Sequence, residues 1–127
     1  ADVIRGKRLG RKIGFPTVNQ VFPSGIVEIK HGIYATVCTT EDKRKYIGVS
    51  NVGIRPTITD GTDSHALNCE TYIVDFDGDL YGTKMTVEFC AYLREEKKFD
   101  SIAQLSAAIE NDKNNALQYF KYKKAPL

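Results

Sequence analysis

Residues 10–19 of the chain read GRKIGFPTVN and combine glycines, cations and small polar side chains. Glycines let backbone N–H groups approach an anion closely, and nearby lysine or arginine adds charge-assisted contacts to phosphate oxygens. The opening of the chain holds three such glycines and five cations: Gly6, Gly10, Gly14, Arg5, Lys7, Arg8, Arg11 and Lys12. Neither GxxxxGK[ST] nor GxGxxG is present, so a phosphate-binding loop and a solvated hairpin loop both remain open.

Thr17 and Asn19 follow Pro16 and lie two residues apart. On a strand, this spacing places both side chains on one face. A hydroxyl and an amide oxygen are hard ligands that Mg²⁺ can take together with nucleotide phosphates. The same residue types also hydrogen-bond to local backbone groups, so this alternative stays open.

Glu70 lies within LNCETYIV, where alternation separates two sets of side chains. One face would carry Leu67, Cys69, Thr71 and Ile73, and the other Asn68, Glu70 and Tyr72. If the polar face lines a cleft, Glu70 is the natural general base; otherwise it is a solvent-facing carboxylate. Glu95 and Glu96 belong to the charge run REEKK, which is typical of a solvated turn.

Segments with two-residue alternation must position these side chains. Apolar residues share one predicted face in GIYATVCTT and one in TKMTVEFCAYL: Ile33, Ala35 and Val37, then Met85, Val87, Phe89, Ala91 and Leu93. Together with RKYIGVSNVG and ALNCETYIVDF, they predict half-buried antiparallel strands. Asp77 and Gly78 predict a turn that links the segments ALNCETYIVDF and TKMTVEFCAYL as a hairpin. Five or six strands with short turns indicate a barrel or sandwich.

A helix is predicted from Ser101 to Asp112, with Ser101 as N-cap and Gln104 three residues later. Its apolar residues at helical spacing are Ile102, Leu105 and Ile109. We expect it to cover one barrel opening. NALQYFKY predicts a second short helix with Leu117 and Phe120 turned inward, and we expect the basic end KYKKAPL to fray.

With 127 residues, 42% hydrophobic and 27% charged, the chain is expected to be one soluble globular domain. It contains no membrane-length apolar run and no signal peptide, so a cytoplasmic location is the default. The net charge of +2 does not favour nucleic acid. Three scattered cysteines, Cys38, Cys69 and Cys90, support neither a disulfide framework nor a zinc site, and we expect them to be reduced and buried.

Taken together, these stretches resemble the riboflavin kinase family, in particular the C-terminal kinase domain of bacterial bifunctional riboflavin kinase/FAD synthetases. The resemblance runs in order through VIRGKRLGRKIGFPTVN, HGIYA, IGVSNVGIRPT, CETYIVDFDGDLYG and VEFCAYLREEKKFDSIAQL. GFPTVN is close to the family's GxPTAN signature, with Val18 where alanine is usual. Glu95 stands where the family commonly has proline.

The resemblance implies a six-stranded antiparallel barrel of Greek-key type with helices at the C-terminal end. It implies transfer of the γ-phosphoryl group of ATP to the 5′-hydroxyl of riboflavin, giving FMN and ADP, with Mg²⁺ or another divalent cation. Glu70 falls on the family's catalytic glutamate. Thr17 and Asn19 would hold the metal, and Tyr81 would lie near the nucleotide.

The remaining implied contacts divide between the two substrates. The ATP-binding positions would be Gly6, Lys7, Gly10, Arg11, Lys12, Gly14, Thr17, Asn19 and Tyr81. On the flavin side, the loop from Arg94 to Phe99, which includes Glu95, would close over riboflavin.

The chain starts at Ala1 and enters a strand-like pair at Val3 and Ile4, so we expect residues 1–127 to be one domain of a longer bifunctional protein. An FMN adenylyltransferase domain would precede it, and this chain would stop at FMN. Small-molecule substrates, without nucleic acid or membrane, are the expected partners. Two other classes remain as alternatives: a non-catalytic flavin-binding or regulatory barrel, and a barrel that binds single-stranded nucleic acid with its basic loop and tyrosines.

Overall fold

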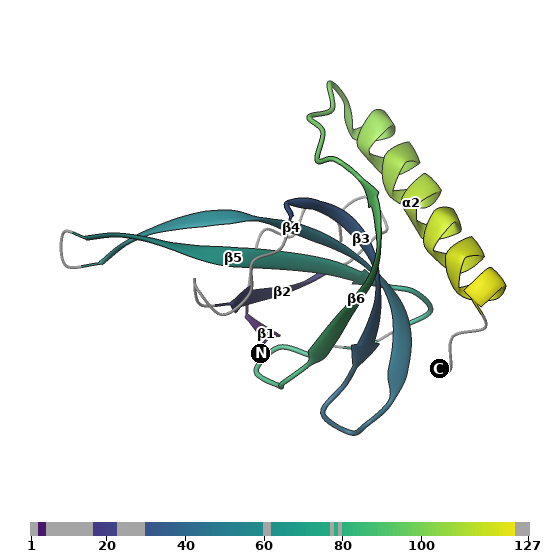
Figure 1. Ribbon diagram of the computed structural model, residues 1–127, viewed down its shortest axis with the longest axis horizontal. Coiled ribbons are helices and arrows are strands. Elements are labelled where there is room, and N and C mark those ends of the chain that lie inside the picture. The colour runs from purple at the N-terminus through teal and green to yellow at the C-terminus, as the bar shows by residue number, and fades with distance from the viewer. Residues whose placement is uncertain are drawn as a thin grey trace.

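The computed structural model describes residues 3–4, 17–22, 30–59, 62–76, 78 and 80–123 of the chain (Figure 1). Within them lie six strands and one helix: β1 (Val3–Ile4), β2 (Thr17–Phe22), β3 (Gly32–Thr39), β4 (Lys45–Thr59), β5 (Thr62–Ile73), β6 (Thr86–Arg94) and α2 (Ile102–Lys123). The mainly β class with a helix at the C-terminal end is therefore confirmed.

The six strands form one antiparallel sheet in the order β1-β2-β5-β4-β3-β6. Strands β3, β4 and β5 follow one another, and β6 returns to lie beside β3, which is the Greek-key order. Among the described strands β1 and β6 are the two edges, with no pairing between them, so a closed barrel is not confirmed.

The predicted hairpin between the last two strands is wrong. β5 pairs with β2 and β4, whereas β6 pairs with β3, so the chain crosses over between β5 and β6. Asp77, half of the predicted turn pair, lies outside the described residues. A turn signal between two strands shows that the chain reverses, but it does not show which strands pair.

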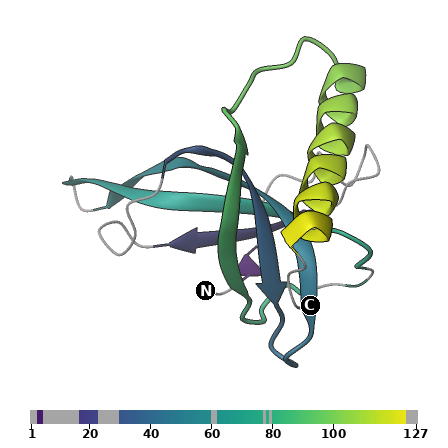
Figure 2. The same cartoon turned by 45° about the vertical axis from the view of Figure 1, so that its right-hand side comes forward.

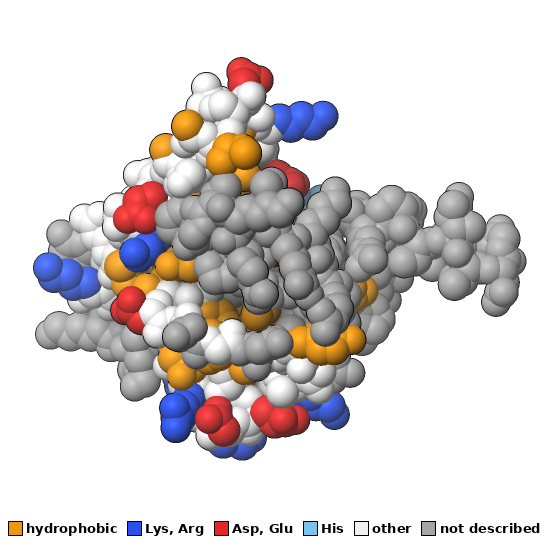
Figure 3. All heavy atoms as spheres, turned by 180° about the vertical axis from the view of Figure 1, so that it is seen from behind, with side chains coloured by type: hydrophobic (Ala, Val, Ile, Leu, Met, Phe, Trp, Pro, Cys, Tyr) orange, Lys and Arg blue, Asp and Glu red, His pale blue; other side chains and the backbone are white. Residues whose placement is uncertain are grey.

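The sheet is strongly twisted, and its longest pair, β4 and β5, reaches beyond the rest of the molecule (Figures 1 and 2). At the opposite end, the β3–β4 hairpin turn carries exposed charges of both signs, visible along the lower margin of Figure 3. These exposed residues are Glu41, Asp42, Lys43, Arg44 and Lys45. The turn therefore faces solvent, away from helix α2.

Strand β3 is buried on both faces and not half-buried as predicted. Ile33, Ala35 and Val37 do share one face, where they pack against Ala116 and Phe120 of α2. The alternate residues face the other side and are buried as well: Tyr34, Thr36 and Cys38. The alternation is correct, but the helix covers one face while the curved sheet encloses the other.

Strand β6 changes its apolar face partway along, in contrast to the single face predicted. Its ladder with β3 shifts register twice, and Cys90 and Leu93 fall between the paired positions. Val87 and Phe89 consequently pack on the enclosed face, whereas Ala91 packs beneath α2. Such β-bulges re-aim side chains, and here they carry the end of the strand toward the helix.

Helix α2 runs without interruption from Ile102 to Lys123, so the predicted pair of helices is wrong. Ser101 is the N-cap, as predicted: its hydroxyl accepts a hydrogen bond from the backbone N–H of Gln104 at 3.2 Å. Ala116 and Phe120 are buried against the sheet, and Leu117 is half-buried. This packing overrides the low helix propensity of the segment NDKNN. No helix among the described residues is long and apolar enough to cross a membrane.

The three cysteines are free, and two of them are buried. Burial raises the pKa of the Cys38 thiol to about 12 and also raises the pKa of the Cys69 thiol. Cys90 is only partly buried. Because the thiolate is the reactive form, burial and a raised pKa both lower reactivity.

We therefore expect thiol labelling of the folded chain at pH 8 to modify Cys90 first, while Cys38 and Cys69 react only after unfolding. Counting modified sites by mass spectrometry before and after addition of guanidinium chloride tests this. The substitution Cys90→Ser is the matched control and should remove the early modification. Rapid labelling of Cys38 in the folded chain would contradict the assigned burial.

Candidate active site

A pocket of about 730 Å³ lies between the sheet and the segment that leads into α2. The sheet contributes side chains from five strands: Thr17, Glu70, Tyr72, Val49, Asn51, Ile33 and Arg94. The segment after β6 and the first turns of the helix contribute Glu96, Lys97, Lys98, Phe99, Asp100, Ser101, Ile102, Leu105, Ile109 and Asp112. The volume falls within the range of roughly 300–1,000 Å³ common for small-molecule sites.

The strand register explains why these sheet residues meet. Directly opposed residues of neighbouring antiparallel strands point to the same face. One such row crosses β2, β5, β4, β3 and β6 in the order Asn19, Glu70, Asn51, Ile33 and Arg94. The pocket therefore follows a row that links the predicted metal residue Asn19, the predicted base and the predicted flavin-side arginine.

Glu70 is held by a neighbouring threonine. The hydroxyl of Thr17 donates a hydrogen bond of 2.7 Å to Glu70 Oε1, across the β2–β5 ladder. Asn19 stands directly opposite Glu70 on β2 and is buried. A hydrogen bond to a carboxylate is charge-assisted and orients the group, so Glu70 enters the pocket in a fixed position.

Arg94 closes the other end of the row. Its Nε and Nη2 donate to the two carboxylate oxygens of Asp112, at 2.8 and 2.7 Å. Nη1 donates to the backbone carbonyl of Glu95 at 3.0 Å, and the guanidinium lies 5.7 Å from the centre of the Phe99 ring. One side chain thus joins the end of β6, the helix and the loop that follows.

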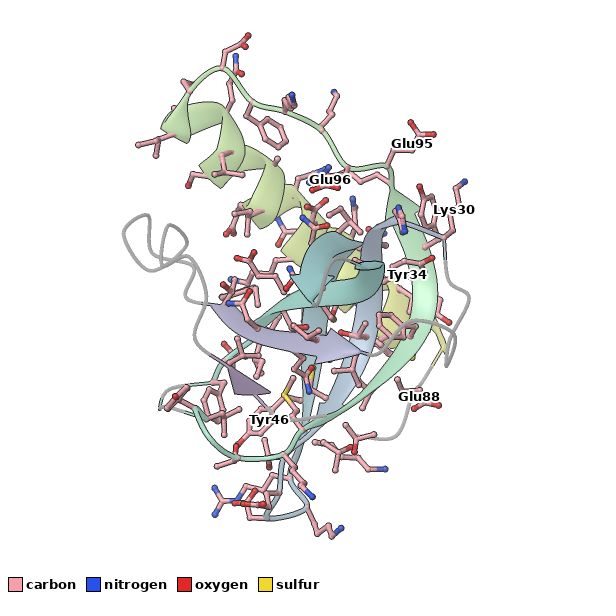
Figure 4. All side chains as sticks on the ribbon, turned by 90° about the vertical axis from the view of Figure 1, so that its left-hand side faces the viewer. Lys30, Tyr34, Tyr46, Glu88, Glu95 and Glu96 are labelled. Atoms are coloured by element: carbon pink, nitrogen blue, oxygen red, sulfur yellow. The ribbon has the colours of Figure 1, made fainter. Side chains whose placement is uncertain are left out.

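The loop of residues 95–101 forms the roof of the pocket and arches from β6 to the start of α2 (Figure 2). Glu95 points away from the molecule, whereas Glu96 turns into the space between loop and sheet (Figure 4). There, Asn51 Nδ2 donates a long hydrogen bond of 3.4 Å to Glu96 Oε1. The cap at Ser101 fixes the far end of the loop.

The structure brings together four of the predicted site residues, since Thr17, Glu70, Arg94 and Phe99 all line the pocket. Asn19 belongs to the same row. Glu95 and Tyr81 do not line the pocket, and their substrate contacts stay predictions; Tyr81 is 51% exposed. The predicted phosphate-side residues Gly6, Lys7, Gly10, Arg11, Lys12 and Gly14 lie outside the described residues.

Sequence reasoning missed Asp112 and Asn51. Asp112 carried a usable signal: it occupies the same helical stripe as Leu105, Ile109 and Ala116, where a carboxylate interrupts an apolar face. A charge on such a face needs a partner, and the partner is Arg94. Asn51 gave no comparable signal, because its contact with the loop depends on the tertiary fold.

The donor set beside Glu70 suits a hard divalent cation. No group of three or more His, Cys, Asp or Glu side chains gathers among the described residues. Thr17, Asn19 and Glu70 nevertheless offer hydroxyl, amide and carboxylate oxygens, and Mg²⁺ takes one or two protein oxygens when phosphates supply the rest. A threonine hydroxyl has one proton and two lone pairs, so Thr17 can donate to Glu70 and still offer its oxygen.

Fold and pocket together define a class of protein: a small, mainly β domain with a ligand pocket that carries an oriented carboxylate, as acid–base enzymes require. The family model of riboflavin kinase matches residues 1–120. The chain therefore belongs to the riboflavin kinase family, whose members phosphorylate riboflavin to FMN.

Individual relatives agree with this assignment. The chain is 38% identical over 125 residues to the trifunctional protein RibF/MnmA of Mycoplasmoides gallisepticum, covering 98% of this chain and 18% of that protein. It is 34% identical over 118 residues to the bifunctional riboflavin kinase/FMN adenylyltransferase of Bacillus subtilis, covering 93% and 37%. The RNA-binding riboflavin kinase RibR of the same species is 34% identical over 110 residues, covering 87% and 45%.

A solved structure supports the fold. A crystal structure described as a macrolide-efflux protein from Streptococcus pneumoniae has a TM-score of 0.74 and 28% identity, and the match covers 89% of this chain and 36% of that one. The chain spans less than half the length of the curated relatives described above. Because RibR is named as RNA-binding, the expected absence of a nucleic-acid partner is not confirmed.

The Arg94–Asp112 pair makes a prediction about stability. The Asp112 side chain is only 3% exposed, so Arg94→Met leaves a buried carboxylate without its cation. We expect a loss of about 3–5 kcal/mol in the free energy of unfolding, as is usual when one partner of a buried pair is removed. Urea titration monitored by circular dichroism measures it.

Arg44→Met is the matched control. Arg44 forms an ion pair with Asp42 that is exposed to solvent, so this substitution should change the free energy of unfolding only slightly. Equal, small effects of the two substitutions would contradict the assigned burial of the Asp112 carboxylate and its need for a cation.

Proposed function

We propose that this domain transfers the γ-phosphoryl group of ATP to the 5′-hydroxyl of riboflavin, producing FMN and ADP. Family membership supports the acceptor, and the Thr17–Glu70 hydrogen bond at the pocket is the observation that carries the mechanism. Phosphoryl transfer needs little covalent chemistry from the protein; alignment of the reactants and stabilisation of phosphate charge supply most of the catalysis.

Glu70 is the proposed general base. Its Oε1 accepts a hydrogen bond from the Thr17 hydroxyl, and the carboxylate has a second oxygen that can accept a hydrogen bond from the substrate hydroxyl. As the 5′ oxygen bonds to phosphorus and ADP leaves, the hydroxyl proton passes to Glu70. A positioned base of this kind contributes about 10² to 10⁴ in rate.

Thr17 and Asn19 are the proposed protein ligands of Mg²⁺ or another divalent cation. Their position beside Glu70 and their hard oxygen atoms support this assignment. A divalent cation bound with ATP would neutralise charge on the phosphates. The family resemblance alone supports the proposal that a further set of residues contacts the same phosphates: Gly6, Lys7, Gly10, Arg11, Lys12 and Gly14.

The flavin is proposed to lie beneath the loop of residues 95–101. Phe99, Ile102, Leu105 and Ile109 give that end of the pocket apolar surface, which suits a flat aromatic ring system. Arg94, the last residue of the row, lines the pocket beside this surface, 5.7 Å from the centre of the Phe99 ring. The ribityl chain would then extend along the row toward Glu70.

Incubation with riboflavin, ATP and Mg²⁺ tests the function directly, with FMN and ADP separated by chromatography. We expect wild-type chain to form FMN, and Glu70→Gln to lose about 10² to 10⁴ in turnover because the amide cannot accept the proton. Riboflavin binding, followed by flavin fluorescence, should persist in this variant. Glu88→Gln, an exposed glutamate on β6, is the matched control.

Near-normal turnover of Glu70→Gln would remove Glu70 from the role of base. Riboflavin binding without FMN formation by the wild-type chain would favour the non-catalytic flavin-binding barrel. An oligonucleotide shift in the same preparation would point instead to the nucleic-acid-binding alternative.

The metal assignment is tested by titrating Mg²⁺ at fixed ATP. Thr17→Val keeps the shape of the side chain but removes the hydroxyl, so we expect weaker apparent Mg²⁺–ATP affinity together with slower turnover; Asn19→Ala should also weaken the affinity. Thr17→Ser keeps the hydroxyl and should remain close to wild type. If Thr17→Val and Asn19→Ala both left the Mg²⁺ dependence unchanged, the proposed metal site would be wrong.

We further propose that the natural protein carries an FMN adenylyltransferase domain N-terminal to this one. Relatives from Bacillus subtilis and Haemophilus influenzae are named bifunctional riboflavin kinase/FMN adenylyltransferases, and the matched region is 37% of each. The described chain would then supply the kinase step only.

A further inference from the structure

We propose that Asp112 is a positioning residue for the riboflavin side of the pocket. It fixes the guanidinium of Arg94 at the pocket wall and, through Arg94, the start of the loop that roofs the site. This inference rests on the proposed function, because it assigns a task to a residue of the same pocket.

The hydrogen bonds of Arg94 run in two directions. Nε and Nη2 bind both carboxylate oxygens of Asp112, which fixes the plane of the guanidinium. With the plane fixed, Nη1 points at the backbone carbonyl of Glu95 and binds it at 3.0 Å. Asp112 therefore orients the Arg94 guanidinium, and the guanidinium in turn determines where the loop leaves β6.

The same orientation places the guanidinium near an aromatic ring. Arg94 lies 5.7 Å from the centre of the Phe99 ring, within the distance at which a cation and a ring attract each other. Phe99 lines the pocket from the middle of the loop. The chain of contacts from Asp112 through Arg94 thus reaches two points on the loop, the Glu95 carbonyl and the Phe99 ring.

The burial of the Arg94–Asp112 pair indicates that the pair contributes to the geometry of the pocket more than to the stability of the fold. Asp112 is 3% exposed and Arg94 26% exposed at their side chains. Replacing a buried ion pair by well-packed apolar groups is often neutral or stabilising, because both charges lose hydration. The helix is in any case attached to the sheet by Ala116 and Phe120. Apolar residues in place of the pair would not provide a guanidinium of defined orientation at the pocket wall.

The experiment compares Asp112→Asn with wild type by flavin fluorescence titration and by FMN formation. The amide keeps the shape of the side chain but loses its charge and one acceptor oxygen, so Arg94 is no longer fixed at both points. We expect the riboflavin Kd and KM to rise about tenfold or more. The KM for ATP should change by less than about twofold, because the proposed phosphate side does not involve this contact.

A merely structural role would give a different pattern. Loss of folded protein lowers the apparent kcat and leaves both KM values in place, so a selective rise in riboflavin KM distinguishes positioning from folding. Glu110→Gln is the matched control, as it makes the same acid-to-amide change on the same helix at a half-exposed site outside the pocket. It should leave both KM values unchanged.

A double variant keeps the inference testable where Asp112→Asn fails to fold. Arg94→Met/Asp112→Leu replaces both charges with apolar groups and is expected to fold. Its riboflavin Kd should rise about tenfold or more over wild type, because the oriented guanidinium is absent. A folded Asp112→Asn or double variant with wild-type riboflavin Kd would overturn the inference. Failure of wild-type chain to bind riboflavin would instead overturn the proposed function, and this inference with it.

Discussion

The burial of β3 on both faces is the constraint on which the rest of the structure depends. A strand buried on both sides needs a layer over each face, and here α2 covers one side while the curved sheet encloses the other (Figure 1). The helix meets this face mainly through Ala116 and Phe120, in its C-terminal half. Toward its N-terminal end, Leu105 and Ile109 face the pocket. The pocket thus lies where α2 passes over the helix-side face of the sheet without packing against it.

The enclosed face holds a polar network that specifies the register. The hydroxyls of Thr36, Ser50 and Thr71 form a buried chain, with O···O distances of 3.0 Å and 2.7 Å. A Cβ at Gly48 would lie 2.7 Å from Thr36 Oγ1, so the network has room only because a glycine stands there. A slip of one residue would expose these hydroxyls and bury Glu70, at the cost of a desolvated carboxylate. The same register therefore places the network inside and Glu70 in the pocket.

Much of this arrangement could be predicted from local pattern. Alternation in LNCETYIV predicted that Glu70 lies on one face of its strand and that Cys69 and Thr71 lie on the other. The spacing of Thr17 and Asn19 predicted that both lie on one face of β2. The strand register and the burial of Cys69 and Thr71 agree with both predictions. The N-cap at Ser101 was equally local. These features depend on neighbours in sequence, which periodicity and capping report directly.

Features that depend on tertiary contacts could not be predicted in this way. The bulges at Cys90 and Leu93 leave no mark on hydrophobic alternation, because apolar residues occupy both faces of β6. A break was expected after Asp112, within the segment NDKNN, which is rich in poor helix formers. Asp112 is instead paired with Arg94, and the turns beyond it are buried, so tertiary energy outweighs propensity.

The row across the sheet also limits how a substrate can lie in the pocket. Glu70 on β5 and Arg94 on β6 belong to the same row and are separated by β4 and β3, which makes three strand spacings. At about 4.8 Å per spacing, the path between the two backbone positions along the curved sheet is about 14 Å. A ligand that reaches both residues extends across these strands, which an elongated molecule with its reacting hydroxyl at one end and its ring system at the other can do. Riboflavin, a flat ring system with a ribityl chain, has this form, and Phe99 of the roof lies at the Arg94 end, with its ring centre 5.7 Å from the guanidinium. The geometry thus supports one direction of binding, with the 5′-hydroxyl at Glu70 and the ring beneath the loop.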